Sequence, residues 1–429
     1  MIDINLIRNN PELVKDNIKK KFQEKKLVLV DEIRNFDITS KQLKQQIDQL
    51  RSQRNILSDK VGAFMREKKV AEANATKQQV VDINTQIATK EAEYEQVSAE
   101  IKKRMMVIPN IMADDVPIGA DDSKNVELQQ FLPQTSYNFE VPYHMDILEK
   151  VGGIDIESAR KISGQGFYFL IGDIARLHSA VLSYARDFMI DKGFTYVIPP
   201  YMIRSEVVNG VMSFEEMDAM MYKIEGEDLF LIGTSEHSMI GRFIGTTLNE
   251  NELPLKLTSS SPCFRKEKGA HGIEERGIYR IHQFEKQEMI IVCKPEDSKD
   301  WYEKLWNYTV ELFTSMQIPV RTLECCSGDL ADLKYKSVDV EAWSPRQKKY
   351  FEVGSCSNLT DAQARRLGIK IKTENGNILA HTLNNTVVAP PRMLIALVEN
   401  HLNADGSINI PTVLQHYMGG KTKIEVKNK

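Results

Sequence analysis

The feature that most constrains this fold is a hydrophobic repeat, spaced alternately by four and three residues, within the first 110 positions. Its first run comprises Leu29, Ile33, Phe36, Ser40, Leu43, Ile47, Leu50, Arg54, Leu57, Val61 and Phe64. Its second run comprises Val80, Ile83, Ile87, Lys90, Tyr94, Val97 and Ile101. Two narrow seams joined by a polar stretch (residues 65–77) can bury each other, so the repeat predicts an antiparallel two-helix coiled coil.

Nothing in the sequence interrupts either predicted helix. No Pro or Gly lies between Pro11 and Gly62, or from Ala63 to Ile108, and Pro109 ends the arm. About 40 residues per helix correspond to roughly 60 Å of length. Before the arm, residues 3–22 predict one short amphipathic helix, with apolar positions Ile4, Leu6, Ile7, Leu13, Val14 and Ile18.

Charge is distributed unevenly along the chain. The formal net charge is −4, yet residues 1–110 carry 21 Lys and Arg against 16 Asp and Glu, whereas the rest carries 35 against 44. The first long helix is the more basic of the two, with eight Lys and Arg against three Asp and Glu from Lys41 to Lys69, and we expect these side chains to meet nucleic acid: Lys41, Lys44, Arg51, Arg54 and Lys60. Few aromatics accompany them, which favours contacts with backbone phosphates. Charge alone fits an ordinary solvated helix equally well.

Several function classes are disfavoured. No run of about 18 apolar residues predicts a membrane span, and the polar N-terminus lacks a signal-like segment, so we expect a cytoplasmic protein. Five cysteines without a CxxC pair, and histidines without HxxxH spacing, indicate reduced thiols and no structural zinc. Neither GxGxxG nor GxxxxGK[ST] occurs, so a bound nucleotide would use neither a Rossmann turn nor a P-loop.

The rest of the chain predicts one catalytic domain. We expect a helical domain over residues 1–110 and a second domain over residues 111–429, with a polar linker at 110–140. Short strands and hairpin-like segments dominate after residue 225, and regular βαβ units are missing. The fold class is therefore expected to be α+β, with a mostly antiparallel sheet covered by helices.

The stretch from residue 263 to 291 carries the strongest chemical signal. In a strand, Arg280, His282, Phe284, Lys286 and Glu288 share one face, as do Cys263, Arg265 and Glu267. The loop between contains Gly269, Gly272 and Gly277. Arginines, carboxylates and an aromatic on one face suit a ligand that is anionic and planar, such as ATP. An edge hairpin held by cross-strand ion pairs is the alternative.

Ordered segments of the chain resemble one enzyme family. FRKE followed by RGIYRIHQFEKQE resembles motif 2 of the class II aminoacyl-tRNA synthetases in its seryl-specific form. LIGTSEH (231–237), YFEVGSCSN (350–358), HTLNNT (381–386) and PPRMLIALVEN (390–400) resemble further seryl-tRNA synthetase segments. KGFTYVIPPYM (192–202), with Pro200, resembles the motif 1 dimer segment, and LRSQRNILSDKVG (50–62) the arm. TSEH and GAHG resemble archaeal forms of the family more than bacterial ones.

The resemblance implies roles residue by residue. Arg265 would bind the α-phosphate, Glu267 the adenine amino group and Arg280 the outer phosphates, with Phe284 and Arg392 sandwiching adenine. Arg265, Glu267, Arg280 and Arg392 are the expected catalytic residues. The full ATP set is Arg265, Lys266, Glu267, Arg280, Ile281, Phe284, Glu352, Val353, Gly354, Ser355 and Arg392. Glu352 and Ser355 would bind Mg²⁺. The serine set is Thr234, Ser235, Glu236, Arg265, Glu288, Asn384 and Thr386. His282 is expected to be structural.

The implied activity is that of a homodimeric serine–tRNA ligase using ATP and Mg²⁺. Serine and ATP form seryl-adenylate, and the terminal ribose of tRNA(Ser) then attacks it; whether the tRNA for selenocysteine is also charged stays open. Two alternatives remain: an amino-acid-activating paralogue that loads a carrier protein, and a non-catalytic tRNA-binding relative. Thr386, Gly354 and the NNTVVAPPR stretch (384–392) depart from the family's commonest residues.

Overall fold

The computed structural model describes residues 1–267 and 277–427, in two compact units. One unit is Ile2–Pro109, and the other comprises Met1 and Asn110–Lys429. Among the described residues, no helix combines the length and apolar character needed to cross a bilayer.

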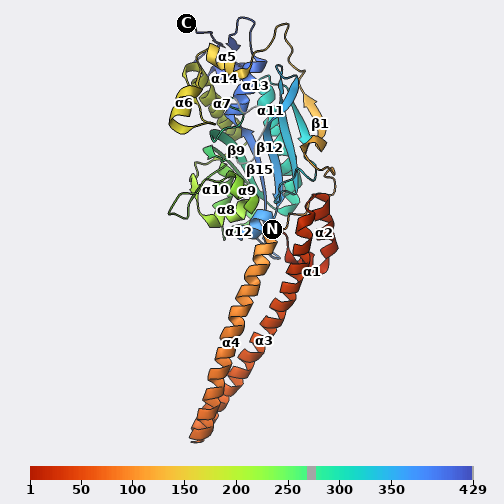
Figure 1. The fold of residues 1–429 in the computed structure, drawn as a ribbon, viewed down its shortest axis with the longest axis vertical. Helices are drawn as coiled ribbons and strands as arrows, with labels where there is room; N and C mark the ends of the chain where they lie inside the picture. The colour runs from red at the N-terminus through yellow and green to blue at the C-terminus, as the bar shows by residue number, and fades with distance from the viewer. Residues whose placement is uncertain (268–276, 428–429) are drawn as a thin grey trace. The chain divides into compact units, whose positions relative to one another are not determined.

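The unit Ile2–Pro109 is a helical hairpin preceded by two short helices (Figure 1). Its elements are α1 (Ile4–Asn9), α2 (Pro11–Lys20), a 3₁₀ turn (Glu24–Lys26), α3 (Leu27–Arg66) and α4 (Val70–Met105). The prediction of one helix over residues 3–22 is wrong. Asn10 ends α1 and caps α2 by accepting from Leu13 N, and Pro11 disfavours helical geometry at the residue before it.

The coiled-coil prediction is confirmed. The predicted seam positions of α3 and α4 are buried or half-buried, and Ile33, Leu43, Ile47 and Ile87 are at most 6% exposed. The seam also continues through Ala73 and Thr76, which lie in the stretch predicted to be polar and weakly patterned. The chain reverses within three residues, where Lys68 has φ 61°. An ion pair from Arg51 to Glu91 (2.7 Å) links the helices at their surface.

The unit from Asn110 onward is built on an eight-stranded sheet. In spatial order its strands are β1 (Val126–Phe131), β10 (Val320–Glu324), β11 (Lys336–Ser344), β12 (Lys349–Thr360), β15 (His381–Val388), β9 (Gln283–Cys293), β8 (Leu255–Phe264) and β4 (Thr195–Tyr196). Every pair is antiparallel except β4 with β8, which confirms the predicted α+β class. The central strands have 8 to 12 residues, so the expectation of short strands is wrong.

Smaller strand groups surround this sheet. They are β14 (Gly376–Leu379), β13 (Lys370–Thr373) and β7 (Thr247–Asn249), with the pairs β16 (Ile408–Asn409) and β17 (Lys423–Ile424), β2 (Ile154–Asp155) and β3 (Phe169–Leu170), and β5 (Met202–Ile203) and β6 (Phe230–Leu231). The predicted linker at 110–140 is wrong in part, because β1 pairs with β10 at the sheet edge. Five of the six residues of β1 are exposed. Because the strand has no buried apolar face, the pattern of apolar residues in the sequence does not predict it.

Helices cover both faces of the sheet. They are α5 (His144–Lys150), α6 (Ile156–Ser163), α7 (Gly172–Asp191), α8 (Ser205–Val211), α9 (Phe214–Met220), α10 (Ser235–Gly241), α11 (Ser298–Ser315), α12 (Ala362–Leu367), α13 (Pro390–Asn400) and α14 (Thr412–Gln415). Met289 and Ile291 of β9 join one core with α7, α11 and α13, while Ile290 and Val292 join a second core with α8, α10 and α12. Burial of alternate β9 residues in opposite cores fixes its register.

Candidate active site

A cavity of about 460 Å³ opens on the sheet face that carries α8, α10 and α12. Residues from β9, β12, β15, α10 and the segment before β11 line it. These segments lie far apart in the sequence, and the antiparallel order β11-β12-β15-β9 brings them together.

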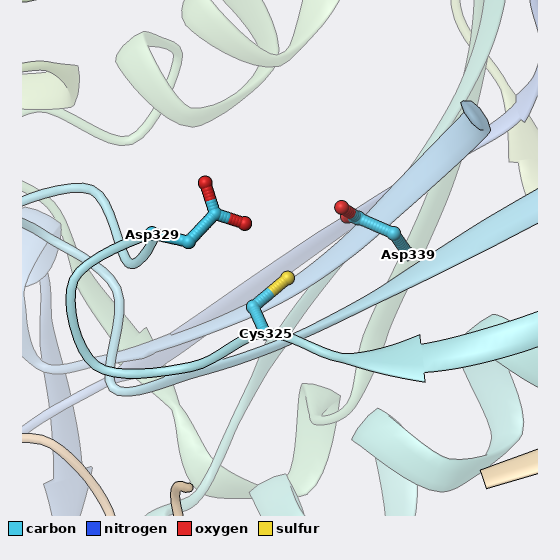
Figure 2. Close-up of side chains that lie close together, drawn as sticks. All are labelled: Cys325, Asp329 and Asp339. Atoms are coloured by element: carbon cyan, nitrogen blue, oxygen red, sulfur yellow. The ribbon is translucent and has the colours of Figure 1, made fainter. Parts of the chain in front are cut away.

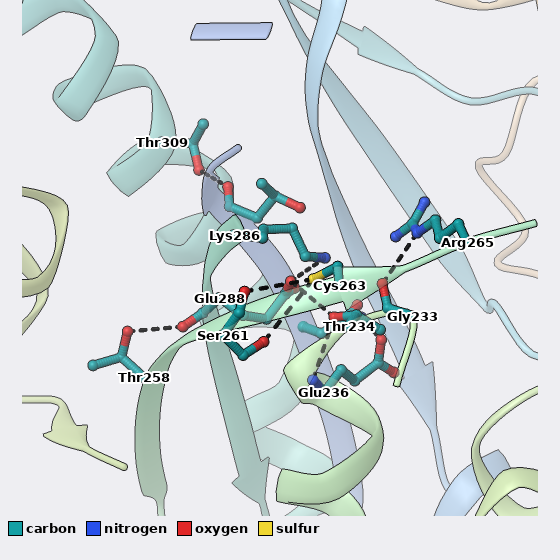
Figure 3. A network of polar contacts seen from close by, with 12 residues as sticks. Gly233, Thr234, Glu236, Thr258, Ser261, Cys263, Arg265, Lys286, Glu288 and Thr309 are labelled. Atoms are coloured by element: carbon teal, nitrogen blue, oxygen red, sulfur yellow. Dashed lines mark hydrogen bonds and ion pairs between the residues drawn. The ribbon is translucent and has the colours of Figure 1, made fainter. Parts of the chain in front are cut away.

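Glu288 lies at the centre of the polar network in this cavity (Figure 3). It stands opposite Thr386 in the β9–β15 register and is 1% exposed. Lys286, on the same face of β9, forms an ion pair with its carboxylate, and Thr234 Oγ1 donates to it at 3.1 Å. The backbone is held as well, because Thr258 Oγ1 donates to Glu288 O at 2.7 Å and Thr309 Oγ1 to Thr386 O at 2.8 Å.

A second carboxylate, Glu236, enters the cavity from the first turn of α10. Gln363 Nε2 donates to its Oε1 at 2.8 Å, and Asn384 Nδ2 donates to its Oε2. Thr382 Oγ1 in turn donates to Gln363 Oε1 at 2.7 Å. Burial, together with the charge of Glu288, raises the pKa of Glu236 to about 7. A cationic ligand between the two carboxylates would relieve that repulsion.

Arg265 and Phe284 lie side by side at the end of the β8–β9 pair. Arg265 Nε donates to Gly233 O at 3.0 Å, and its guanidinium lies 5.3 Å from the centroid of the Phe284 ring. Arg280 reaches Glu267 at 3.1 Å. The predicted strand alternation does not extend this far, because β8 ends at Phe264 and β9 begins at Gln283. Of the three loop glycines, Gly269 and Gly272 lie outside the described residues.

His282 ties the two chain segments beyond these strand ends together. Its Nδ1 lies 2.9 Å from Arg265 O, and Arg265 N donates to His282 O at 2.9 Å. These backbone-directed contacts fit the structural role expected for His282.

A β-bulge places Glu352 and Ser355 in the same cavity. In β12, Gly354 pairs with Val340 whereas Glu352 pairs with Glu341, so one extra residue is inserted between them. Strict alternation would direct Glu352 and Ser355 to opposite faces. With the bulge, both line the cavity, and Arg392 pairs with Glu352 Oε2 at 3.0 Å while lying 4.6 Å from the Tyr279 centroid.

Side chains of metal-binding type also meet beside this bulge (Figure 2). One potential ligand atom each from Cys325, Asp329 and Asp339 lie within 4.8 Å of one another. Asp339 pairs with Ser355 across β11 and β12. All five cysteines are free and buried, as expected for reduced thiols, and burial raises the pKa of Cys325.

Most predicted ligand residues meet in this cavity. Lining it are Thr234, Glu236, Arg265, Glu267, Arg280, Ile281, Phe284, Glu288, Glu352, Val353, Gly354, Ser355, Asn384, Thr386 and Arg392. Lys266 and Ser235 are not among the lining residues: Lys266 Nζ lies 5.9 Å from the Tyr222 centroid, and Ser235 is fully buried. The five predicted tRNA-contacting residues all lie on α3, where Arg54 is half-buried and the other four are exposed.

Three further polar side chains of this region carry no role in the sequence analysis. Lys334 and Asp339 line the cavity, and Gln363 supports Glu236 from behind. In β11, Asp339 is two residues from both Ser337 and Glu341, so strand alternation places the three polar side chains on one face. That alternation is the sequence signal that could have identified Asp339. Lys334 precedes the strand and Gln363 lies on a short helix, so strand alternation indicates neither.

Comparison with known proteins agrees with this geometry. Residues 1–112 match the family model "Seryl-tRNA synthetase N-terminal domain", and residues 220–401 match "tRNA synthetase class II core domain (G, H, P, S and T)". A serine–tRNA ligase of Methanoregula boonei is 38% identical over 98% of this chain and 99% of its own. The crystal structure of the Pyrococcus horikoshii seryl-tRNA synthetase complexed with ATP superposes with a TM-score of 0.94, at 37% identity and full coverage of both chains.

A eukaryotic structure agrees as well. The cytoplasmic serine–tRNA ligase of Naegleria fowleri, in complex with AMP, matches with a TM-score of 0.88 and 32% identity, over 100% of this chain and 99% of that one. Similarity of this extent covers both the helical hairpin and the antiparallel core with its cavity. The chain therefore belongs to the seryl-tRNA synthetase family and is a serine–tRNA ligase with a class II catalytic core.

Proposed function

We propose that the cavity around Glu236 and Glu288 binds serine and joins it to AMP. The observation that carries this proposal is the placement of two buried carboxylates and two threonine hydroxyls, Thr234 and Thr386, around one small space. Carboxylates suit the α-ammonium group, and the remaining acceptors and hydroxyls suit the side-chain hydroxyl. Alanine would leave those buried polar groups without partners, so the cavity should reject it.

The nucleotide occupies the part of the cavity beyond Arg265. The Phe284 ring and the Arg392 guanidinium offer stacking faces for the two sides of adenine, and the guanidinium groups of Arg265 and Arg280 offer charge for the phosphates. Arg265 neutralises the charge that develops on the α-phosphate as the serine carboxylate attacks it. Pyrophosphate then leaves toward Arg280.

Mg²⁺ fits the donor set on β11 and β12. Glu352, Ser355 and Asp339 offer carboxylate and hydroxyl oxygens, the ligands that a hard cation bound to phosphates prefers. We assign Glu352 and Ser355 as its protein ligands. When bound, the ion supplies charge neutralisation on the phosphates. The residues themselves orient the reactants, and this orientation with fixed positive charge supplies most of the acceleration.

The helical unit binds tRNA(Ser) through the basic side of α3. Lys41, Lys44 and Lys60 are exposed there, as phosphate contacts require. We also propose a homodimer formed through the segment around Pro200, with the arm of one subunit serving the active site of the other. An arm used in this way distinguishes tRNA charging from the loading of a carrier protein.

Serine-dependent ATP–pyrophosphate exchange tests the site. Exchange should require serine, with alanine, threonine and cysteine as poor competitors. Arg265→Ala should abolish it, whereas Arg242→Ala, at the exposed C-terminal end of α10, should not. Unchanged exchange by Arg265→Ala would show that the site is wrongly assigned. Exchange without charging of tRNA(Ser) would favour a carrier-loading enzyme.

A further inference from the structure

Lys334 places a positive charge beside the proposed Mg²⁺ ligands. Its Nζ donates to Ser355 Oγ at 3.3 Å and to Ser337 Oγ at 3.2 Å. The side chain lines the cavity although the residue precedes β11, so the ammonium reaches inward from the connecting segment. Ser355 is therefore bonded to a cation of the protein itself.

A second cation lies beside the other proposed ligand. Glu352 pairs with Arg392 at 3.0 Å. Lys334 and Arg392 thus place two positive charges among the oxygens that would bind Mg²⁺, and these charges repel a free divalent ion.

We propose that Lys334 is a positioning residue that makes metal binding depend on the nucleotide. Its ammonium holds Ser355 and repels a free divalent cation, so the metal enters only together with the phosphates of ATP. The negatively charged triphosphate then supplies the attraction that the protein site lacks. This inference rests on the proposed Mg²⁺ role of Glu352 and Ser355.

The group shown in Figure 2 has a different meaning under this proposal. Cys325, Asp329 and Asp339 have the spacing of a metal site, yet Asp339 stands opposite Ser355, to which the Lys334 ammonium is bonded. A protein that relied on these residues for a resident metal would not place an ammonium among them. Removal of the lysine charge should therefore make the region attractive to metal without any nucleotide.

Mn²⁺ binding to the full-length protein, followed by the electron paramagnetic resonance signal of the free ion, tests this. Without ATP, the wild type should show no saturable binding at Mn²⁺ concentrations where Lys334→Met does. The expected gain in affinity is roughly tenfold or more, because the ammonium beside Ser355 no longer repels the ion. Lys336→Met is the matched control. It removes a lysine two positions away that pairs with Asp115 at 2.6 Å, and it should behave like the wild type.

Further variants separate the possible outcomes. Lys334→Arg keeps the charge and should also behave like the wild type; Lys334→Gln replaces Lys334→Met if thermal melting shows that the latter is unfolded. If the uncharged variant binds Mn²⁺ no more tightly than the wild type in the absence of ATP, the proposed role of Lys334 is wrong. The metal assignment itself is tested separately by Glu352→Gln, which should weaken Mn²⁺ binding in the presence of ATP. No change there would overturn the assignment of Glu352 instead.

Discussion

Replacement of Gln363 by Met should weaken serine binding, although Gln363 does not line the cavity and acts through Glu236. Gln363 is fully buried and joins three elements: it donates to Glu236 Oε1 at 2.8 Å and to Val211 O at 3.2 Å, and accepts from Thr382 at 2.7 Å. Methionine has a similar length and no amide. The bond to Glu236 is charge-assisted, and such bonds contribute about 1.5–3 kcal/mol. The expected rise in KM for serine is therefore roughly 10- to 150-fold.

The pH dependence separates this positioning role from a general packing defect. The pKa of Glu236 is about 7, so serine affinity in the wild type should fall as pH drops through that value and the carboxylate is protonated. Loss of a donor to the carboxylate favours its neutral form. In Gln363→Met the fall in affinity should therefore occur roughly one to two pH units higher, which is the same free energy expressed as a pKa shift.

The assay is steady-state pyrophosphate exchange with serine and ATP varied in turn, from pH 6 to 9. Gln287→Met is the matched control: Gln287 is equally buried, donates to Thr258 Oγ1 at 2.7 Å, and has the opposite parity in β9 from Glu288. Both variants should melt at lower temperature, but only Gln363→Met should raise the serine KM. A serine KM within twofold of wild type, or a parallel rise in the KM for ATP, would refute the reasoning.

Three other perturbations follow from the same structure. Since the pKa of Glu236 rises from 4.5 to about 7 on folding, the folded protein binds more protons between those values, so this group's contribution to the free energy of unfolding falls as pH rises from 4.5 to 7. Glu236→Gln should flatten that part of a plot of melting temperature against pH. Thr386→Val should weaken serine binding by about 1–3 kcal/mol, which corresponds to a rise in the KM for serine of roughly 5- to 150-fold. The weak exchange with alanine should not change, and competition between serine and alanine in the exchange assay measures both effects. Deletion of residues 30–105 should spare pyrophosphate exchange and abolish tRNA charging; equal loss of both activities would contradict the proposed division of labour.

The helical hairpin was the most predictable part of the fold. A coiled-coil seam depends on residues three and four positions apart, so the sequence shows it directly, and Ile33, Leu43, Ile47 and Ile87 are buried as expected. The pattern of apolar residues failed to predict structure where burial of large apolar side chains does not determine it. Ala73 and Thr76 continue the seam with small side chains, and β1 joins the sheet through its backbone while its side chains stay exposed.

The candidate site was predictable as a set of residues and much less as a geometry. Ordered motifs identified most of the cavity lining, from Thr234 to Arg392, because the motifs are contiguous stretches of sequence. Lys266 and Ser235, their immediate neighbours in those motifs, are not part of the lining. Adjacent positions in a motif point in different directions, and only the backbone path decides which of them face the ligand.

By itself, therefore, the sequence determined the coiled coil, the antiparallel α+β class and the family, since each depends on local periodicity or on contiguous motifs. Tertiary structure alone decided which polar groups support the chemistry. The bulge in β12 directs Glu352 and Ser355 into one cavity, against the alternation expected of a strand. Gln363 reaches Glu236 across 127 positions, and Lys334 reaches Ser355 from outside the strand. Such contacts depend on where separate elements meet, and no local pattern in the sequence records that.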